Sequence, residues 1–204
     1  MLFGSEYKTI SNFPEATITE QGSRFLAYAF CVSNEKELKD NIEKIKLKFP
    51  DATHHCFACI LHPDKSFIKI NDDGEPSNTA GRPILIQINK LDITNILLVV
   101  VRYYGGKKLG IPGLISAYGN AASKCLENAE VIVKKLYDYY KLFSIPEKDF
   151  EIYNIVKKHK AKIIKIATNN KTEIEIAIDR ESTDKFLKEC HFLPNFEVKY
   201  IKTE

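Results

Sequence analysis

The chain has 204 residues, of which 44% are hydrophobic and 28% charged, and this composition predicts a globular protein with one or two hydrophobic cores. Its formal net charge of +3 is too small to indicate nucleic-acid binding by itself. No apolar run approaches the roughly 18 residues of a membrane-spanning helix, and the first residues combine acids with Pro14 where a signal peptide is basic and then apolar. We therefore expect a cytoplasmic protein with no membrane partner.

Hydrophobic periodicity predicts strands and helices in the first two thirds of the chain. Strands are expected at residues 22–32, 54–61, 66–71 and 95–104. A helix follows the first strand, because Asn34 and Glu37 form a capping box, and a helix rich in small residues is expected to begin near Gly113. Residues 84–93 fit two structures: β-branched side chains favour a strand, whereas Pro83 before spaced aliphatic residues favours a helix.

Residues 134–204 predict a second domain, because strands and helices follow one another there in the order β-α-β-β-α-β. The expected strands are residues 137–145, 162–168, 172–179 and 196–202. The expected helices are residues 146–161 and 182–192, the second capped by Ser182. A hairpin turn is predicted at residues 169–171. This is the order of the ferredoxin-like fold, so with a first domain at residues 1–133 we expect a two-domain α+β protein.

The five cysteines are an odd number and lie mostly among apolar neighbours, which predicts free thiols in a reducing compartment. Cys56 and Cys59 have the spacing of a zinc or redox pair, but no second ligand pair follows. A three-residue offset on a strand also puts the two thiols on opposite faces. We therefore expect buried structural cysteines, no metal and no cofactor. His54 is a candidate site residue if its end of the strand opens near the glycine-rich segment described below.

Residues 72–83, "DDGEPSNTAGRP", predict a loop, which we call the acidic loop. Its candidate site residues are Asp73, Glu75, Ser77, Thr79 and Arg82, and Asp72 is the third carboxylate of the loop. Carboxylates this close together can hold a cation or shift one another's pKa. An ordinary turn explains the same residues, with Ser77 or Thr79 capping the helix that follows. Both interpretations are open on the spacing alone.

Residues 102–110, "RYYGGKKLG", end a buried strand in cations, aromatic rings and glycines, and we call this segment the glycine loop. Its candidate anion-binding residues are Arg102, Tyr103, Tyr104, Gly105, Gly106, Lys107, Lys108 and Gly110. Backbone N–H groups before a helix can bind an anion, and the cations would strengthen that binding. Residues 1–133 carry 15 Lys and Arg against 15 Asp and Glu, so a basic surface there has to be local. The segment matches neither the Walker nor the dinucleotide motif, and glycines that only let the chain turn explain it equally well.

Taken together, the two loops resemble the IMPACT/YigZ family, in its bacterial two-domain form. The family signature runs through spaced aliphatic residues to Arg-aromatic-aromatic-Gly-Gly-x-x-aliphatic-Gly. This chain matches it without a gap at Gly81, Ile84, Leu85, Ile88, Ile93, Val99, Val100, Arg102, Tyr103, Tyr104, Gly105, Gly106, Leu109 and Gly110. The resemblance covers roughly residues 17–129.

Three positions depart from the family pattern. Asn78 replaces a glycine of the acidic loop, and because asparagine tolerates positive φ we expect the loop to keep its shape. Pro112 stands in place of the first glycine of a pair before the helix. Ser116 replaces an arginine of that helix, which weakens the case for RNA contact there.

The resemblance implies a first domain like domain 2 of ribosomal protein S5 and a tail like the C-terminal modules of translational GTPases. It therefore implies a translation-associated regulatory factor without catalysis, which binds RNA, the ribosome or another phosphate-bearing partner through the glycine loop. In this hypothesis Arg102, Lys107 and Lys108 meet phosphates, while Asp73, Glu75 and Arg82 order the acidic loop. One alternative is an enzyme acting on a phosphorylated small molecule or nucleotide, with Asp73 or Glu75 as base or metal ligand. The other is a protein–protein adaptor in translation control that uses the exposed sheet face of the second domain.

Overall fold

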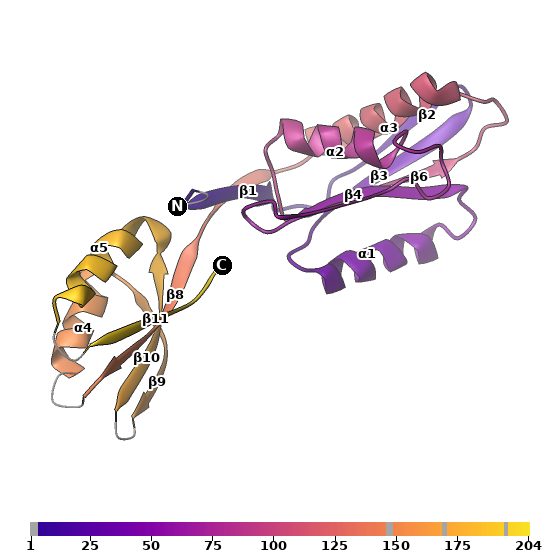
Figure 1. Cartoon of the computed structure of the whole chain (residues 1–204). Coiled ribbons are helices and arrows are strands. Elements are labelled where there is room, and N and C mark those ends of the chain that lie inside the picture. The colour runs from indigo at the N-terminus through magenta and orange to yellow at the C-terminus, as the bar shows by residue number, and fades with distance from the viewer. Residues whose placement is uncertain (1–3, 146–148, 169–170, 194–195) are drawn as a thin grey trace. The chain divides into compact units, whose positions relative to one another are not determined.

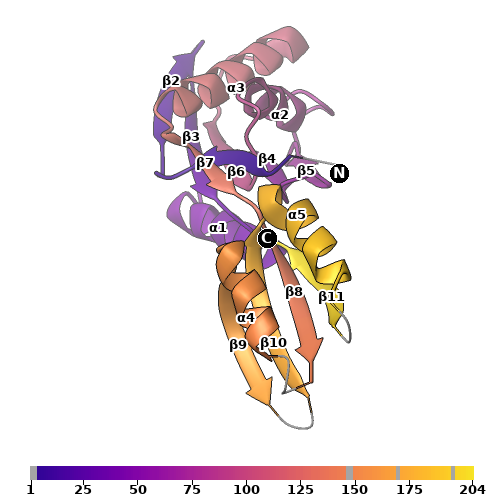
Figure 2. The ribbon, with the colours of Figure 1, turned by 90° about the vertical axis from the view of Figure 1, so that its left-hand side faces the viewer.

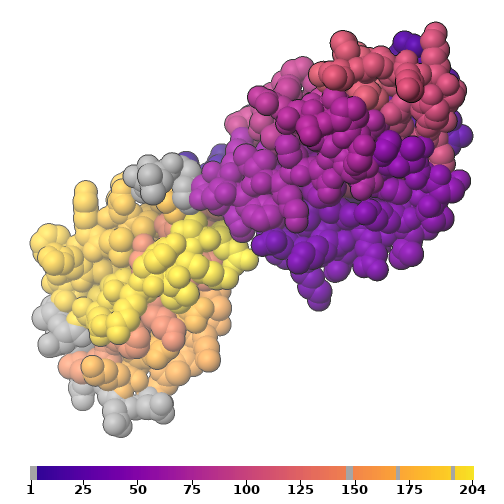
Figure 3. Space-filling view, turned by 45° about the vertical axis from the view of Figure 1, so that its right-hand side comes forward, coloured from indigo at the N-terminus to yellow at the C-terminus, as the bar shows by residue number. Residues whose placement is uncertain are grey.

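The computed structural model describes residues 4–145, 149–168, 171–193 and 196–204. The chain divides into two compact units, the first formed by Tyr7–Lys134 and the second by Lys135–Glu204 with residues 4–6 (Figure 1). Figure 3 draws the two units in space-filling form, with the first unit in indigo to pink and the second in orange to yellow. None of the described helices has the length and apolar character needed to cross a membrane.

The first unit is built on a five-stranded antiparallel sheet with strand order β2-β3-β6-β4-β5. The strands are β2 (Glu15–Glu20), β3 (Ser23–Cys31), β4 (His54–Leu61), β5 (Phe67–Asn71) and β6 (Ile96–Tyr103). Helix α1 (Glu35–Lys48) covers one face, and α2 (Gly81–Lys90) and α3 (Gly110–Glu127) cover the other (Figure 1). The central strand β6 contributes Leu98 and Val100 to the core under α2 and α3, and Val99 to the core under α1. This burial on both faces confirms the prediction for that strand.

Local capping explains where the helices of the first unit begin. The Oδ1 atom of Asn34 accepts from the Glu37 amide at 3.0 Å, as the capping box predicts. The Glu37 carboxylate accepts the amide of Ser33 at 2.8 Å, one residue earlier than in the standard box, and this bond lowers the pKa of Glu37. The ambiguous segment is the helix α2, and α3 begins at Gly110, three residues before the expected start.

Three short strands were not expected from the sequence. β1 (Glu6–Ile10) and β7 (Val131–Lys135) pair as a two-stranded sheet, and β2 forms an edge of the five-stranded sheet. β2 and β7 are largely exposed, and β1 is buried only at Thr9 and Ile10. All three are five or six residues long and mix polar with apolar residues, so none shows the long apolar run that marks a buried strand.

The second unit is a four-stranded antiparallel sheet with strand order β11-β8-β10-β9. Its elements are β8 (Tyr137–Ser144), α4 (Asp149–Lys158), β9 (Lys162–Thr168), β10 (Thr172–Asp179), α5 (Arg180–His191) and β11 (Glu197–Thr203). Both helices pack on one face of the sheet (Figure 2), over a core that includes Ile174, Ile176 and Phe186. The element order and the α+β class are as predicted. Residues 146–148 of the expected helix and 169–170 of the expected turn lie outside the described residues.

The start of α5 corrects one prediction. The helix begins at Arg180, and its cap is Asp179, whose Oδ1 accepts the amide of Glu181 at 3.1 Å. Ser182 therefore lies inside the first turn. A carboxylate at this position caps as well as a hydroxyl, so the periodicity alone could not separate the two.

The five cysteines, all in described parts of the chain, are free. Cys56 belongs to the core under α2 and α3 and Cys59 to the core under α1, so the two thiols lie on opposite faces of the sheet as predicted. Burial raises the pKa of Cys56 above its usual range and that of Cys59 to about 12. Cys31 is the half-buried member of the set.

We therefore expect iodoacetamide at neutral pH to label Cys31 first in the native protein, because a raised pKa and burial both suppress the reactive thiolate elsewhere. Peptide mapping by mass spectrometry measures the order of labelling, and the urea-unfolded chain, in which all five thiols should react alike, is the control. Native labelling of Cys56 as fast as Cys31 would contradict the burial described above.

Candidate functional site at the acidic and glycine loops

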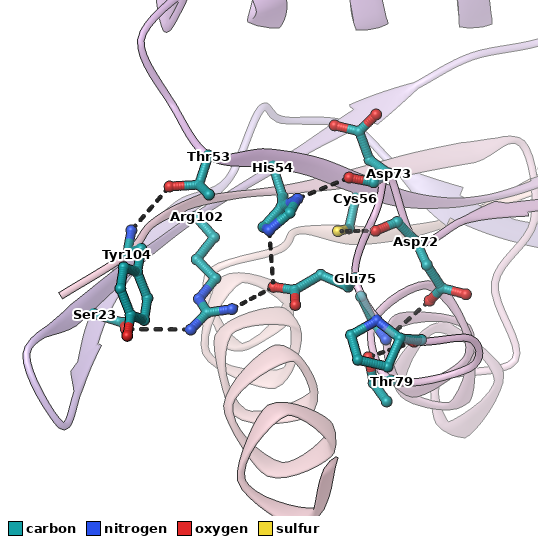
Figure 4. Close-up of polar contacts among 12 residues, drawn as sticks. Ser23, Thr53, His54, Cys56, Asp72, Asp73, Glu75, Thr79, Arg102 and Tyr104 are labelled. Atoms are coloured by element: carbon teal, nitrogen blue, oxygen red, sulfur yellow. Dashed lines mark hydrogen bonds and ion pairs between the residues drawn. The ribbon is translucent and has the colours of Figure 1, made fainter. Parts of the chain in front are cut away.

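A buried ion pair joins the acidic loop to the end of β6. The Nη1 atom of Arg102 donates to the Oε1 atom of Glu75 at 2.6 Å, and the two residues are only 5% and 9% exposed (Figure 4). The hydroxyl of Tyr118, from α3, donates to the same oxygen at 2.7 Å. The Nε2 atom of His54 lies 3.8 Å from it. One carboxylate thus connects the acidic loop with two neighbouring strands and a helix.

This pairing gives Arg102 a buried position, whereas the prediction was that its guanidinium meets phosphates. Its guanidinium also donates to the Oγ atom of Ser23 at 3.4 Å and lies over the rings of Phe25 and Tyr104. A guanidinium buried against a carboxylate and two rings is not free to meet an external phosphate. Arg82, expected to order the acidic loop, is exposed and forms no ion pair with any described residue. The arginine that holds this loop is Arg102, which the sequence could not indicate because the pair joins positions 27 residues apart.

The acidic loop is shaped by its first carboxylate. The Oδ1 atom of Asp72 accepts the amides of Ala80 at 3.0 Å and Gly81 at 2.8 Å, and its Oδ2 atom accepts that of Asn78 at 2.8 Å. Asp72 therefore caps α2 from outside the helix, in place of the expected Ser77 or Thr79. Asn78 has a φ of +65°, which confirms the tolerance expected for asparagine there.

The expected cap residues have other positions. The hydroxyl of Thr79 is buried and donates to the carbonyl of Pro76 at 2.6 Å. Ser77 is exposed. The first amides of α2 are held by Asp72 and not by either hydroxyl.

The remaining carboxylate, Asp73, holds the start of β4. Its Oδ2 atom accepts the amide of His55 at 2.7 Å, and its carbonyl accepts from Nδ1 of His54 at 2.7 Å. This arrangement brings His54 beside the acidic loop, half-buried. No group of three or more metal-binding side chains occurs among the described residues. Asp73 and Glu75 accept hydrogen bonds from protein donors in this structure.

The glycine loop is divided into an anchored part, residues 102–105, and an open part, residues 106–110. The Gly105 amide donates to the Oγ atom of Ser23 at 3.2 Å, and a Cβ added at Gly105 would lie 2.0 Å from the carbonyl carbon of Gly22. Gly105 is needed for this close approach of two backbone segments. Gly106, by contrast, has a φ of +84° and nothing within 4 Å of an added Cβ.

Lys107 and Lys108 are exposed and form no ion pair within the described parts of the chain. They precede the start of α3, whose N-cap residue Leu109 offers no side-chain hydrogen bond to the first-turn amides. Gly110, the first residue of α3, is exposed as well. Two free cations and the positive end of a helix dipole therefore lie together on the surface.

A shallow depression of about 430 Å³ adjoins this open part, lined by Gly22, Arg24, Asp51, Tyr103 and Tyr104. The ring of Tyr104 is 47% exposed, and the guanidinium of Arg24 lies 5.3 Å from the centre of the Tyr103 ring. The Tyr103 hydroxyl donates to Asp51 at 2.9 Å; partial desolvation and this bond raise the pKa of Tyr103. Sequence reasoning missed Arg24 and Asp51. Arg24 lies beside Tyr103 through the register of β3 with β6, which the sequence alone does not give.

The comparison with family models decides the family. Residues 21–126 match the model of the Impact N-terminal domain, just over half of the chain. The chain belongs to the IMPACT family. Both loops of the candidate site fall inside the matched residues.

Relatives of this IMPACT family member are known from sequence and structure. It is 42% identical over 130 residues to IMPACT family member YvyE of Bacillus subtilis, covering 64% of this chain and 60% of that protein. It is 41% identical over 106 residues to IMPACT family member YigZ of Escherichia coli, covering 51% of this chain and 52% of that protein. The matches thus span about 60% or less of these curated relatives.

A crystal structure described only as that of an hypothetical protein is 27% identical and matches with a TM-score of 0.76 over 98% of this chain and 99% of that one. A structure of the two-domain translational regulator Yih1 matches 56% of this chain and 46% of that one at 26% identity. Its TM-score of 0.38 is too low for the two folds to be compared.

Proposed function

We propose that this IMPACT family member is a cytoplasmic, translation-associated regulatory factor that binds RNA or the ribosome through the open part of the glycine loop. The observation that carries the proposal is the exposure of Lys107 and Lys108 beside the start of α3 and the depression lined by Tyr104. The role in translation follows the family resemblance, and the related protein Yih1 is described as a translational regulator.

The chemistry of this surface suits a phosphate-bearing partner. Lysine ammonium groups and helix N-terminal amides bind phosphate oxygens, and an exposed tyrosine ring can stack on a nucleotide base. Arg24 replaces Arg102 as the arginine available at this surface, because Arg24 is exposed. The alternative in which Asp73 or Glu75 is a catalytic base gains no support, since both carboxylates already accept hydrogen bonds from protein donors.

Fold-level resemblance forms part of the same proposal. The strand order β11-β8-β10-β9, with both helices on one face, supports the ferredoxin-like assignment of the second unit. The likeness of the first unit to domain 2 of ribosomal protein S5 rests on the sequence resemblance. Because fold alone does not establish function, the test has to address the loop itself.

The double substitution Lys107→Ala with Lys108→Ala is expected to weaken binding to purified ribosomes or single-stranded RNA at least tenfold, because each lysine is expected to neutralise a phosphate. The slope of log affinity against log salt concentration should also fall, by about 0.7–0.9 for each phosphate that is no longer neutralised. Cosedimentation and fluorescence anisotropy over a salt series measure both effects.

Lys36→Ala with Lys39→Ala, on the exposed face of α1, is the matched control because it removes the same charge elsewhere on the first unit. It should leave affinity within about twofold of the wild type. The proposal fails if the control loses as much affinity as the loop variant, or if binding does not depend on salt.

A further inference from the structure

The sheet of the second unit has a face that no described helix of that unit covers, opposite α4 and α5 (Figure 2). Strand β8 alternates strictly: Asp138, Tyr140, Leu142 and Ser144 are buried on the helix side. The residues between them point to the open face and are half-buried, namely Tyr137, Tyr139, Lys141 and Phe143. Three aromatic rings therefore lie in a row along the open side of a central strand, which we call the aromatic row.

Each ring of the aromatic row has a lysine over it. The ammonium of Lys162, from β9, lies 5.0 Å from the centre of the Tyr137 ring. From β11, the ammonium of Lys202 lies 4.8 Å from the Tyr139 ring and that of Lys199 lies 5.1 Å from the Phe143 ring. The rings are thus bordered by cations from the strands at both edges of the sheet.

The acidic groups on this face are matched by lysines. Glu173 pairs with Lys141 at 2.6 Å, and Glu197 with Lys199 at 3.1 Å. Glu175 lies in register with Lys141 on one side and Lys165 on the other. Lys202 pairs with Glu204 at the end of the chain.

The charge of the second unit favours an anionic partner. Residues 134–204 carry 15 Lys and Arg against 12 Asp and Glu, so the net charge of this part is positive. Lys162 has no ion pair among the described residues; its contact is the ring of Tyr137. A lysine ammonium sits on a flexible stem of four carbons, so it can leave the ring for a phosphate while the ring stays fixed in the strand.

We propose that the aromatic row is a second nucleic-acid site, on which bases of single-stranded RNA stack while the flanking lysines of β9 and β11 bind the phosphates. Tyr137 and Tyr139 are two residues apart on the strand and so about 7 Å apart, and Phe143 lies four residues beyond Tyr139, about 14 Å away, so each ring has room for a base of its own. Base–aromatic stacking tolerates any sequence, because every base has a π-face. This inference concerns a different unit from the glycine loop and does not rest on the function proposed above.

The test uses the full chain and a fluorescein-labelled single-stranded RNA of twelve nucleotides. Tyr139→Leu and Phe143→Leu are each expected to weaken binding about fivefold or more, the loss that follows from one unstacked base. Tyr139→Phe keeps the ring and is expected to bind within about twofold of the wild type. Because the chain has no tryptophan, quenching of tyrosine emission by the RNA is a second readout of stacking.

Three comparisons separate stacking from other causes. Circular dichroism melting of each variant shows whether the second unit stays folded, and Lys157→Ala with Lys188→Ala, on exposed positions of α4 and α5, controls for lost charge. A duplex of the same sequence, whose bases are not available, should bind at least tenfold more weakly. A poly-glutamate peptide should not compete at equal charge.

The outcomes also separate this site from the glycine loop. Two results together support the aromatic row. The Leu variants lose RNA affinity, and RNA still quenches the tyrosine emission of the variant that carries Lys107→Ala and Lys108→Ala. The inference is overturned if folded Leu variants bind as the wild type does, if the duplex binds equally well, or if poly-glutamate displaces the RNA. None of these outcomes bears on the glycine loop proposal, which is tested by Lys107→Ala with Lys108→Ala.

Discussion

Replacing Glu75 with alanine is expected to lower the free energy of unfolding of the first unit by about 3–5 kcal/mol, the usual cost of breaking a buried ion pair by removing one partner. The substitution leaves the guanidinium of Arg102 charged and buried, and it takes away the acceptor of the Tyr118 hydroxyl. Hydrogen exchange of the β4 and β6 amides measures the loss in the first unit alone.

Two comparison variants make this prediction specific. Glu127→Ala breaks the exposed pair with Lys124 and is expected to cost less than about 1 kcal/mol. Glu75→Gln combined with Arg102→Met removes both buried charges and should recover part of the stability lost in Glu75→Ala. A loss in Glu75→Ala no larger than in Glu127→Ala would show that the pair is solvated in solution.

Gly105→Ala is the substitution with the second largest expected effect, a loss of about 1–3 kcal/mol from overpacking. The added Cβ would lie 2.0 Å from the carbonyl carbon of Gly22 and 2.3 Å from the amide nitrogen of Ser23. Both are backbone atoms, so neither can move aside as a flexible side chain would. The shift in the urea midpoint of the first unit measures the effect.

Gly119→Ala is the matched control for this substitution. Gly119 lies within α3, and an added Cβ would be 3.5 Å from the nearest atom, on the side chain of Gln87. Alanine favours a helix interior over glycine, so the control is expected to be neutral or stabilising by up to about 1 kcal/mol. Equal losses at both positions would argue against the close backbone approach at Gly105.

Local features of the fold were predictable from the sequence. Three predictions depended only on neighbouring residues, and the structure confirms them. They are the capping side chain of Asn34, the buried strand β6 and the alternation of Ile174 and Ile176 in β10. The start of α3 was predicted near Gly113, whereas the helix begins at Gly110, because the sequence does not show which glycine ends the loop. Ser182 failed as a cap for a related reason: nearby capping residues compete, and only the backbone decides between them.

The candidate site was predictable in its parts and not in its connections. Both loops were identified, yet the Arg102–Glu75 pair depends on the acidic loop folding back over the start of β4. Arg24 reaches the glycine loop only through the register of β3 with β6. Contacts of this kind join residues tens of positions apart, and hydrophobic periodicity carries no information about them.

The anchoring of the glycine loop has a consequence for the rate and cost of association. Its first residue is held by the Glu75 carboxylate and its fourth by the backbone of Gly22 and the side chain of Ser23, so the peptide path is set as far as Gly105, and α3 begins again at Gly110. A ligand would then have to order only residues 106–109 and the two lysine side chains among them, which spares it the entropy of ordering the whole loop. Recognition at such a rigid platform is expected to proceed by direct docking, without a slow isomerisation step.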